Sequence, residues 1–170
     1  ARLIDAFQTQ STILLFGDYD VDGTSAVTLL TLALEELGFQ VKYYIPDRYQ
    51  EGYGLSYQGV DHADKEGINL MICLDCGIKA IEKVRYAKTK GIDVIICDHH
   101  NPGSTLPEAN AVLDPKRPDC TYPYKELTGC GVGLKLLQAL VQRMREEGLP
   151  LPSPDYDPLE QYADLLTLSI

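Results

Sequence analysis

Short apolar runs alternate with amphipathic stretches along the chain. The runs predict buried strands at Ile13–Phe16, Val41–Ile45, Leu70–Leu74, Val94–Cys97 and Ala111–Leu113, because short apolar runs bounded by turn residues are usually strands. Apolar stripes at helical spacing predict helices over residues 26–37, 56–66, 80–90 and 129–147, and the start of another at Leu159. Alternating strands and helices are typical of an α/β fold. We therefore expect a Rossmann-like open parallel sheet of about five strands, with helices on both faces.

The 170 residues are the length of one domain with a sizeable core. Prolines concentrate in the stretch after the last long helix. We expect the core domain over residues 1–147 and a Pro-rich linker over residues 148–158. Residues 159–170 would then begin a helix that leads to further parts of the protein.

Three carboxylates follow the first predicted strand at every second position: Asp18, Asp20 and Asp22. We expect the strand to stay extended that far, with Gly23 ending it and Thr24 or Ser25 capping the next helix. In an extended backbone, residues two apart point to the same side, so the three acids would converge. Because like charges this close repel one another, a divalent cation is expected between them.

Two more strands end in residues of the same kind. Asp75 follows the third strand, and Asp98, His99 and His100 follow the fourth. The carboxyl ends of parallel strands open on one edge of the sheet, so we expect a single site at that edge. Carboxylates with imidazoles suit Mn²⁺ or Mg²⁺ better than zinc or copper, and bridging carboxylates suit two ions that act on a phosphodiester. His100 could instead contact the scissile phosphate or protonate the leaving group.

Three weaker candidates lie elsewhere in the chain. Arg48, in a Gly-rich loop, is either a phosphate clamp or a surface charge. Gly131 and Gly133, at a helix start, could present N–H groups to a phosphate, although close helix packing explains them nearly as well. Cys73 and Cys76 have the spacing of zinc or redox sites. On a strand they would point to opposite faces, so we expect them to be core thiols.

Charge and cysteine content narrow the class of protein. The net charge of −10 argues against a basic groove on this domain as the main grip on nucleic acid. Five cysteines without disulfide spacing favour reduced thiols in a cytoplasmic protein. No apolar stretch approaches the roughly 18 residues of a membrane helix, so we expect no membrane association.

The acidic motifs together resemble those of a known superfamily. Gly17–Gly23, Asp75–Gly77 and Asp98–His100 are similar to the first three motifs of the DHH phosphoesterases. Residues 51–56, 114–120 and 129–133 are similar to the RecJ family within it. The resemblance implies a DHH domain that hydrolyses single-stranded DNA from its 5′ end with two Mn²⁺ or Mg²⁺ ions, in DNA repair and recombination.

The resemblance also assigns roles to individual residues, with Asp75 as the bridge between the two ions. The implied metal ligands are Asp20, Asp22, Asp75 and His99. The implied catalytic residues are His100, Asp98 and Asp18. The resemblance does not identify the protein partners, which stay unknown.

A fourth family motif supplies one more metal-binding Asp, shortly after a stretch that resembles Tyr162–Leu166. The DHH-associated domain and the DNA-binding parts of the family would follow. We therefore expect single-stranded DNA to be bound by the full-length protein, and little activity from this chain alone. Two alternatives remain open: a phosphodiesterase of oligoribonucleotides or cyclic dinucleotides, and a metal-free binding scaffold.

Overall fold

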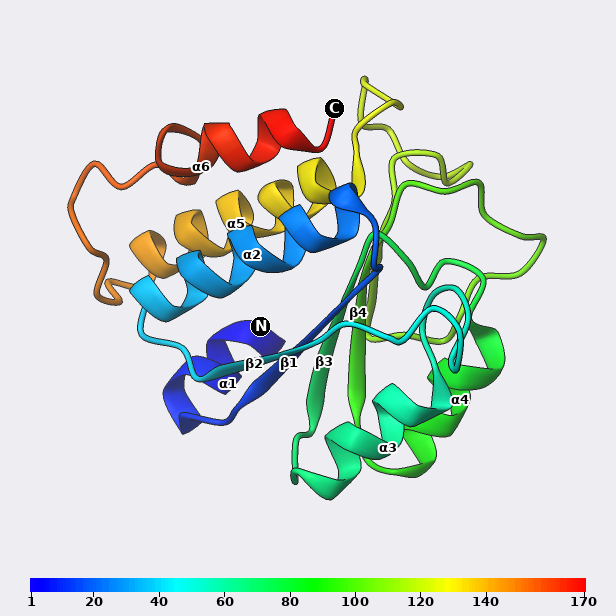
Figure 1. Ribbon diagram of the computed structural model, residues 1–170. Coiled ribbons are helices and arrows are strands. Elements are labelled where there is room, and N and C mark those ends of the chain that lie inside the picture. The colour runs from blue at the N-terminus through cyan, green and yellow to red at the C-terminus, as the bar shows by residue number, and fades with distance from the viewer.

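The computed structural model describes all 170 residues and contains one five-stranded sheet. All neighbouring strands are parallel, in the order β2-β1-β3-β4-β5 (Figure 1). The strands are β1 (Ile13–Gly17), β2 (Val41–Tyr44), β3 (Leu70–Leu74), β4 (Asp93–Cys97) and β5 (Ala111–Leu113). This confirms the open parallel sheet predicted from the sequence.

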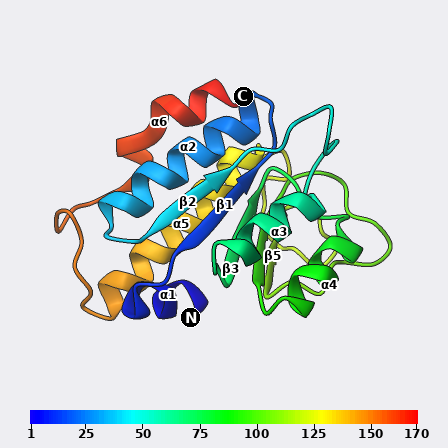
Figure 2. The ribbon, with the colours of Figure 1, turned by 60° about the horizontal axis from the view of Figure 1, so that its bottom comes forward.

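Six helices accompany the sheet: α1 (Arg2–Thr9), α2 (Val21–Glu36), α3 (Tyr57–Lys65), α4 (Ile81–Thr89), α5 (Gly129–Glu146) and α6 (Pro158–Leu168). Figures 1 and 2 show α1, α2 and α5 on one face of the sheet and α3 and α4 on the other. The sequence analysis did not predict α1, whose Leu3, Ile4 and Ala6 are buried. None of the helices is both long and apolar enough to cross a membrane.

The central strands are apolar on both sides because both faces of the sheet are covered. All five residues of β1 and of β3 are buried, whereas β2 and β5 at the edges are only partly buried. Ile13 and Leu15 belong to the core beneath α2 and α5, and Leu14 and Phe16 to the core beneath α3 and α4. This alternation follows from the two-residue period of a strand.

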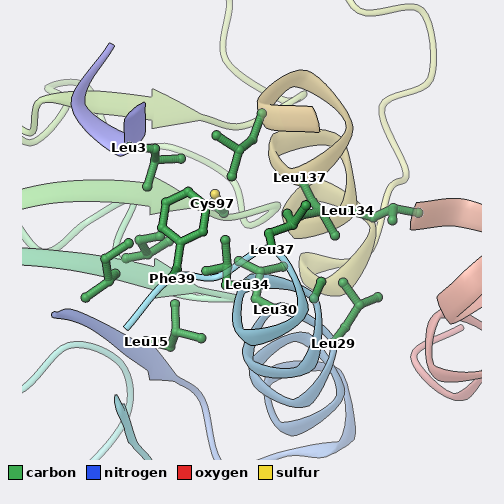
Figure 3. Close-up of a cluster of buried hydrophobic side chains, with 14 of the residues drawn as sticks. Leu3, Leu15, Leu29, Leu30, Leu34, Leu37, Phe39, Cys97, Leu134 and Leu137 are labelled. Carbon is green, nitrogen blue, oxygen red and sulfur yellow. The ribbon is translucent and has the colours of Figure 1, made fainter. Parts of the chain in front are cut away.

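The larger core lies between the sheet and the pair α2 and α5 (Figure 3). Leu30 and Leu34 of α2 meet Leu134 and Leu137 of α5 in this core, and all four are at most 3% exposed. Truncating a buried leucine of this kind to alanine costs about 2–5 kcal/mol. The packing of α2 against α5 therefore contributes strongly to the stability of the fold.

The chain after α5 returns to the outer side of α2. The hydroxyl groups of Tyr156 and Tyr162 donate hydrogen bonds to Oε2 of Glu36, at 3.1 and 2.8 Å. Both tyrosines are buried, so α6 adds an apolar layer over α2.

The prediction that β1 stays extended as far as Asp22 is wrong. The strand ends at Gly17, and α2 already begins at Val21, with Asp20 rather than Thr24 or Ser25 as its N-cap. The Asp20 side chain accepts a hydrogen bond from the N–H of Gly23 at 2.9 Å, the standard arrangement of an acidic N-cap. Gly23 sits inside the first turn, where a Cβ atom would lie 2.5 Å from the carbonyl oxygen of Asp18.

The connections after β1 and β3 leave in opposite directions. The chain after β1 enters α2 on one face of the sheet, and the chain after β3 enters α4 on the other. Because β1 and β3 are neighbours, their carboxyl ends form a topological switch point, where open parallel sheets bind ligands.

Candidate active site

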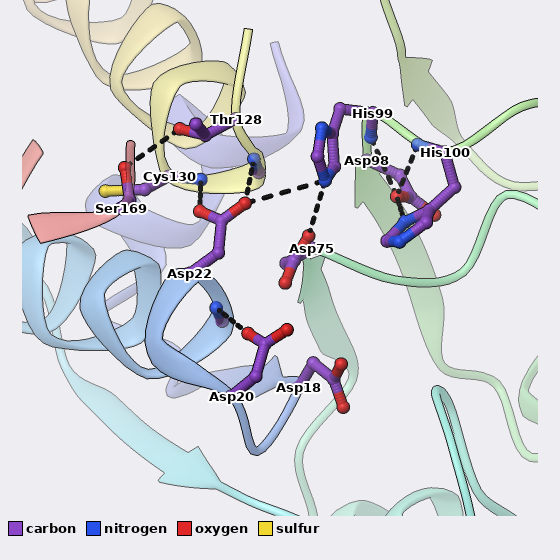
Figure 4. Close-up of polar contacts among 12 residues, drawn as sticks. Asp18, Asp20, Asp22, Asp75, Asp98, His99, His100, Thr128, Cys130 and Ser169 are labelled. Atoms are coloured by element: carbon purple, nitrogen blue, oxygen red, sulfur yellow. Dashed lines mark hydrogen bonds and ion pairs between the residues drawn. The ribbon is translucent and has the colours of Figure 1, made fainter.

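Four strands each deliver one buried acid to the same edge of the sheet. Asp18 follows β1, Asp75 follows β3, Asp98 follows β4 and Asp114 follows β5. The first three are 1% exposed and Asp114 is 4% exposed. Burial raises the pKa of Asp18 and of Asp114, because a buried carboxylate loses its hydration. The topology thus brings together acids from Asp18 to Asp114, which are 96 residues apart in sequence. Figure 4 shows the first three of them.

Asp75 is the most constrained of these acids. Its φ is 61°, a left-handed conformation that is uncommon for a residue other than glycine. Burial raises the pKa of Asp75 to about 7; contact with His99 opposes this shift, and the charges of Asp22 and Asp20 add to it. Its buried Oδ1 atom lies 3.1 Å from Nε2 of His99 but accepts no hydrogen bond of regular geometry. A buried oxygen in this state fits a cation ligand.

The ligand atoms fall into two groups that share Asp75. One group is Asp18, Asp20 and Asp75, and the other is Asp75, His99 and His100; within each group the atoms lie within 4.8 Å of one another. Carboxylate oxygens with one or two imidazoles suit Mn²⁺ or Mg²⁺. The residues present therefore fit two divalent ions with Asp75 between them.

Asp22 joins the two helices that flank the site. Its two carboxylate oxygens accept hydrogen bonds from the N–H groups of Gly129 and Cys130 in the first turn of α5, each at 2.7 Å (Figure 4). A carboxylate at a helix N-terminus is stabilised by the helix dipole. His99 Nε2 lies 3.5 Å from the nearer Asp22 oxygen, so Asp22 borders the site from the α5 side. Its role as a metal ligand stays a prediction.

Asp98 holds the histidines that follow it. Its Oδ1 accepts hydrogen bonds from the N–H of His99 and from Nδ1 of His100, both at 2.7 Å, and its Oδ2 accepts one from the N–H of Ile78 at 2.9 Å. Burial alone would raise the pKa of Asp98, but the hydrogen bonds from the His100 side chain and from the N–H groups of Ile78 and His100 outweigh it, and the pKa is lowered. The hydrogen bond to Asp98 raises the pKa of His100, and the contact with Asp75 raises that of His99. The charged form of His100 is thereby favoured.

The sequence analysis missed two residues at this edge. The hydroxyl group of Tyr53 lies 3.1 Å from Nε2 of His100. Asp114 accepts a hydrogen bond from the N–H of Lys116 through Oδ1, while its buried Oδ2 has no partner. Asp114 could have been found by the rule that identified the other acids, because it directly follows the fifth predicted strand.

The proposed substrate-binding residues lie around the same edge. The Arg48 guanidinium lies 5.4 Å from the ring centroid of Tyr19, next to Asp18. The N–H of Gly131 donates to the side chain of Thr128 at 3.0 Å, and a Cβ atom on Gly133 would lie 3.2 Å from Leu30. Substrate binding by Arg48, Gly131 and Gly133 stays a prediction.

The expectation that Cys73 and Cys76 point to opposite faces is wrong. Both are fully buried in the same core cluster, where a hydrogen bond with the Cys73 thiol and burial raise the pKa of Cys76. The left-handed turn at Asp75 swings the chain back and brings the two side chains together. Both remain free thiols in a core without further cysteine pairs.

Comparison with known proteins identifies the family. The model of the DHH family, N-terminal domain, matches residues 12–170. The chain belongs to the DHH family. This confirms the resemblance of its acidic motifs, and the edge described above is the edge that carries them.

Similar curated proteins are single-stranded-DNA-specific RecJ exonucleases. The DHH chain is 44% identical to RecJ of Bacillus subtilis over 150 residues, which is 88% of the chain and 19% of that protein. It is 38% identical to RecJ of Thermus thermophilus over 166 residues, which is 97% of the chain and 23% of that protein. The chain therefore spans about a fifth to a quarter of the length of these relatives.

A solved structure of exonuclease RecJ bound to manganese has the same fold. It superimposes with a TM-score of 0.80 at 37% identity, over 97% of the DHH chain and 39% of that structure. A second RecJ structure in complex with Mn²⁺, from Thermus thermophilus, gives a TM-score of 0.74 at 34% identity. The agreement confirms the fold class of the DHH domain.

Proposed function

We propose that this DHH domain is the metal-dependent catalytic core of a single-stranded-DNA-specific 5′→3′ exonuclease. The observation that carries the proposal is the position of Asp75. This buried acid with a free oxygen belongs to both groups of ligand atoms. Sequence identity of about 40% to RecJ exonucleases, and the manganese in a RecJ structure of the same fold, support the same conclusion.

The residues divide into metal ligands and residues that handle protons. Asp20, Asp22, Asp75 and His99 would hold two Mn²⁺ or Mg²⁺ ions, with Asp18 beside them. Bound ions of this kind lower the pKa of a water molecule and neutralise charge on the phosphate. Asp18 and Asp75 are buried at this edge, so the charge of an ion held between them would be screened less than in bulk water.

His100 is the proposed proton donor. Its Nδ1 is hydrogen-bonded to Asp98, and this contact raises the pKa of His100 and so favours its protonated form. Attack of water on phosphorus breaks the P–O3′ bond, and His100 would pass its proton to the departing O3′ or hold the scissile phosphate. The products are a 5′-mononucleotide and a strand with a new 5′-phosphate. We place this reaction in DNA repair and recombination in the cytoplasm.

The test is a nuclease assay of the natural full-length protein. Single- and double-stranded DNA labelled at the 5′ end, oligoribonucleotides and cyclic dinucleotides would be compared with Mn²⁺, with Mg²⁺ and with EDTA. We expect mononucleotide release from single-stranded DNA alone, dependent on metal. Asp75→Ala should abolish it, and Asp155→Ala, at an exposed acid without an ion pair, should not.

Other outcomes would contradict the proposal. Preferred cleavage of cyclic dinucleotides or short oligoribonucleotides would assign the same metal site to a different substrate. The absence of Mn²⁺ binding in a calorimetric titration of the full-length protein would favour a binding scaffold.

A further inference from the structure

Most of the 15 lysines and arginines are already engaged within the chain. They form ion pairs with acids or donate hydrogen bonds to oxygen atoms. The cations that do neither are Arg48, Lys65, Lys79 and Lys83. In a chain with a net charge of −10, a cation without an acidic partner is an exception that calls for an explanation.

Two of these cations lie together beside the catalytic edge. Lys79, in the turn between β3 and α4, and Lys83, in the first turn of α4, line a pocket of about 190 Å³. The same pocket is lined by Asp98, His100 and Tyr53. It is therefore continuous with the group proposed to donate the proton.

The walls of this pocket leave room for a ligand. Gly54 and Gly77 line it without side chains, and both have a positive φ, of 75° and 109°. The ammonium group of Lys83 lies 5.9 Å from the ring centroid of Tyr57, a cation–π contact that leaves its charge without an acidic partner. Ala80, the N-cap of α4, offers no side-chain hydrogen bond, so the positive end of this helix dipole adds to the two charges.

We propose that the pocket between Lys79, Lys83 and His100 binds a phosphate of the DNA strand next to the scissile one. The inference rests on the proposed function. If His100 contacts the scissile phosphate, a phosphate one nucleotide away must lie close to His100, and this pocket is the cationic space there. The lysines would also attract the strand to an edge that is otherwise acidic. Two phosphates have this chemistry: the terminal 5′-phosphate and the next internal phosphodiester.

The experiment measures kcat and KM of the full-length protein with Mn²⁺ at several KCl concentrations. The substrates are two oligothymidylates of 12 nucleotides, one with a 5′-phosphate and one with a 5′-hydroxyl. The variants are Lys79→Ala/Lys83→Ala, the charge-preserving Lys79→Arg/Lys83→Arg, and Lys65→Ala as the matched control. Lys65 is the remaining unpaired lysine and lies in the last turn of α3.

We expect the double alanine variant to raise KM about tenfold or more, since a hydrogen bond to a charged group is lost. Its plot of log(1/KM) against log[KCl] should be shallower by about 0.7, the value for one phosphate on a single strand. The arginine variant should have a KM and a salt dependence close to those of the wild type. Lys65→Ala should match the wild type in both. If the loss disappears on the 5′-hydroxyl substrate, the ligand is the terminal phosphate. If the loss persists there, it is the internal phosphodiester.

A double alanine variant with the KM and salt dependence of the wild type would overturn the inference. So would a loss confined to kcat, or an arginine variant as impaired as the alanine variant, because these indicate a structural role. Failure of the wild type itself to degrade single-stranded DNA would instead refute the proposed function.

Discussion

The substitution Asp75→Asn should stabilise the metal-free protein at alkaline pH. Asn is isosteric with Asp and can accept the same contact from His99, but it cannot ionise. Burial raises the pKa of Asp75 from 3.8 to about 7, so ionising this side chain destabilises the folded state. The folded protein binds a proton on Asp75 more tightly than the unfolded chain does. The free-energy cost of ionising Asp75 in the folded state therefore grows as the pH rises from about 4 to about 7.

The magnitude follows from the pKa. The penalty is absent well below pH 4, grows by about 1.4 kcal/mol for each pH unit between the two pKa values, and is constant above about pH 7. At pH 8.5 the free energy of unfolding of Asp75→Asn in EDTA should exceed that of the wild type by about 4 kcal/mol. At pH 5 the free energy of unfolding of Asp75→Asn should exceed that of the wild type by only about 2 kcal/mol.

The assay is urea denaturation in EDTA at pH 5, 7 and 8.5, followed by circular dichroism. Asp155→Asn, at an exposed acid, serves as the matched control and should show no pH-dependent difference from the wild type. With excess Mn²⁺ at pH 8.5 the wild type should instead be more stable than Asp75→Asn, because Mn²⁺ stabilises only the protein that has the intact metal site. The reasoning is refuted if Asp75→Asn in EDTA is less stable than the wild type at pH 8.5, or if its advantage is the same at pH 5.

Three further predictions concern stability. Gly129→Ala should destabilise the protein by roughly 1–3 kcal/mol in urea denaturation, because its Cβ atom would lie 2.5 Å from Asp75. The same variant should bind Mn²⁺ more weakly in calorimetry. Gly131→Ala, whose Cβ atom would have its nearest contact at 3.3 Å, is the control and should change both quantities little. Asp22→Asn should cost about 1–3 kcal/mol, because its amide would face one of two N–H donors, and an unchanged urea midpoint would contradict this. Tyr162→Phe should cost about 1 kcal/mol through the lost hydrogen bond to Glu36, and the double variant with Glu36→Gln should show less than the sum of the two losses.

The alternation of apolar runs and amphipathic stretches predicted the parallel sheet and four of its helices to within a few residues. Local signals were strong there: Ser56 caps α3 and Gly91 follows α4 with a φ of 72°. The helix start at Val21 was misplaced because the acids of the first motif fit two local structures. As an N-cap, Asp20 satisfies a backbone N–H of the first turn, and this contact favours the helix.

The sequence alone determined which chemical groups reach the edge of the sheet. Once the strands are parallel, the residues that follow them must share that edge, so Asp18, Asp75 and Asp98 were assigned to it without coordinates. Only the tertiary structure decided what each group does there. Burial sets the pKa of Asp75, the approach of α5 engages Asp22, and the turn at Asp75 brings Cys73 and Cys76 together. These properties depend on contacts between segments far apart in the chain, and a linear pattern carries no information on such distances.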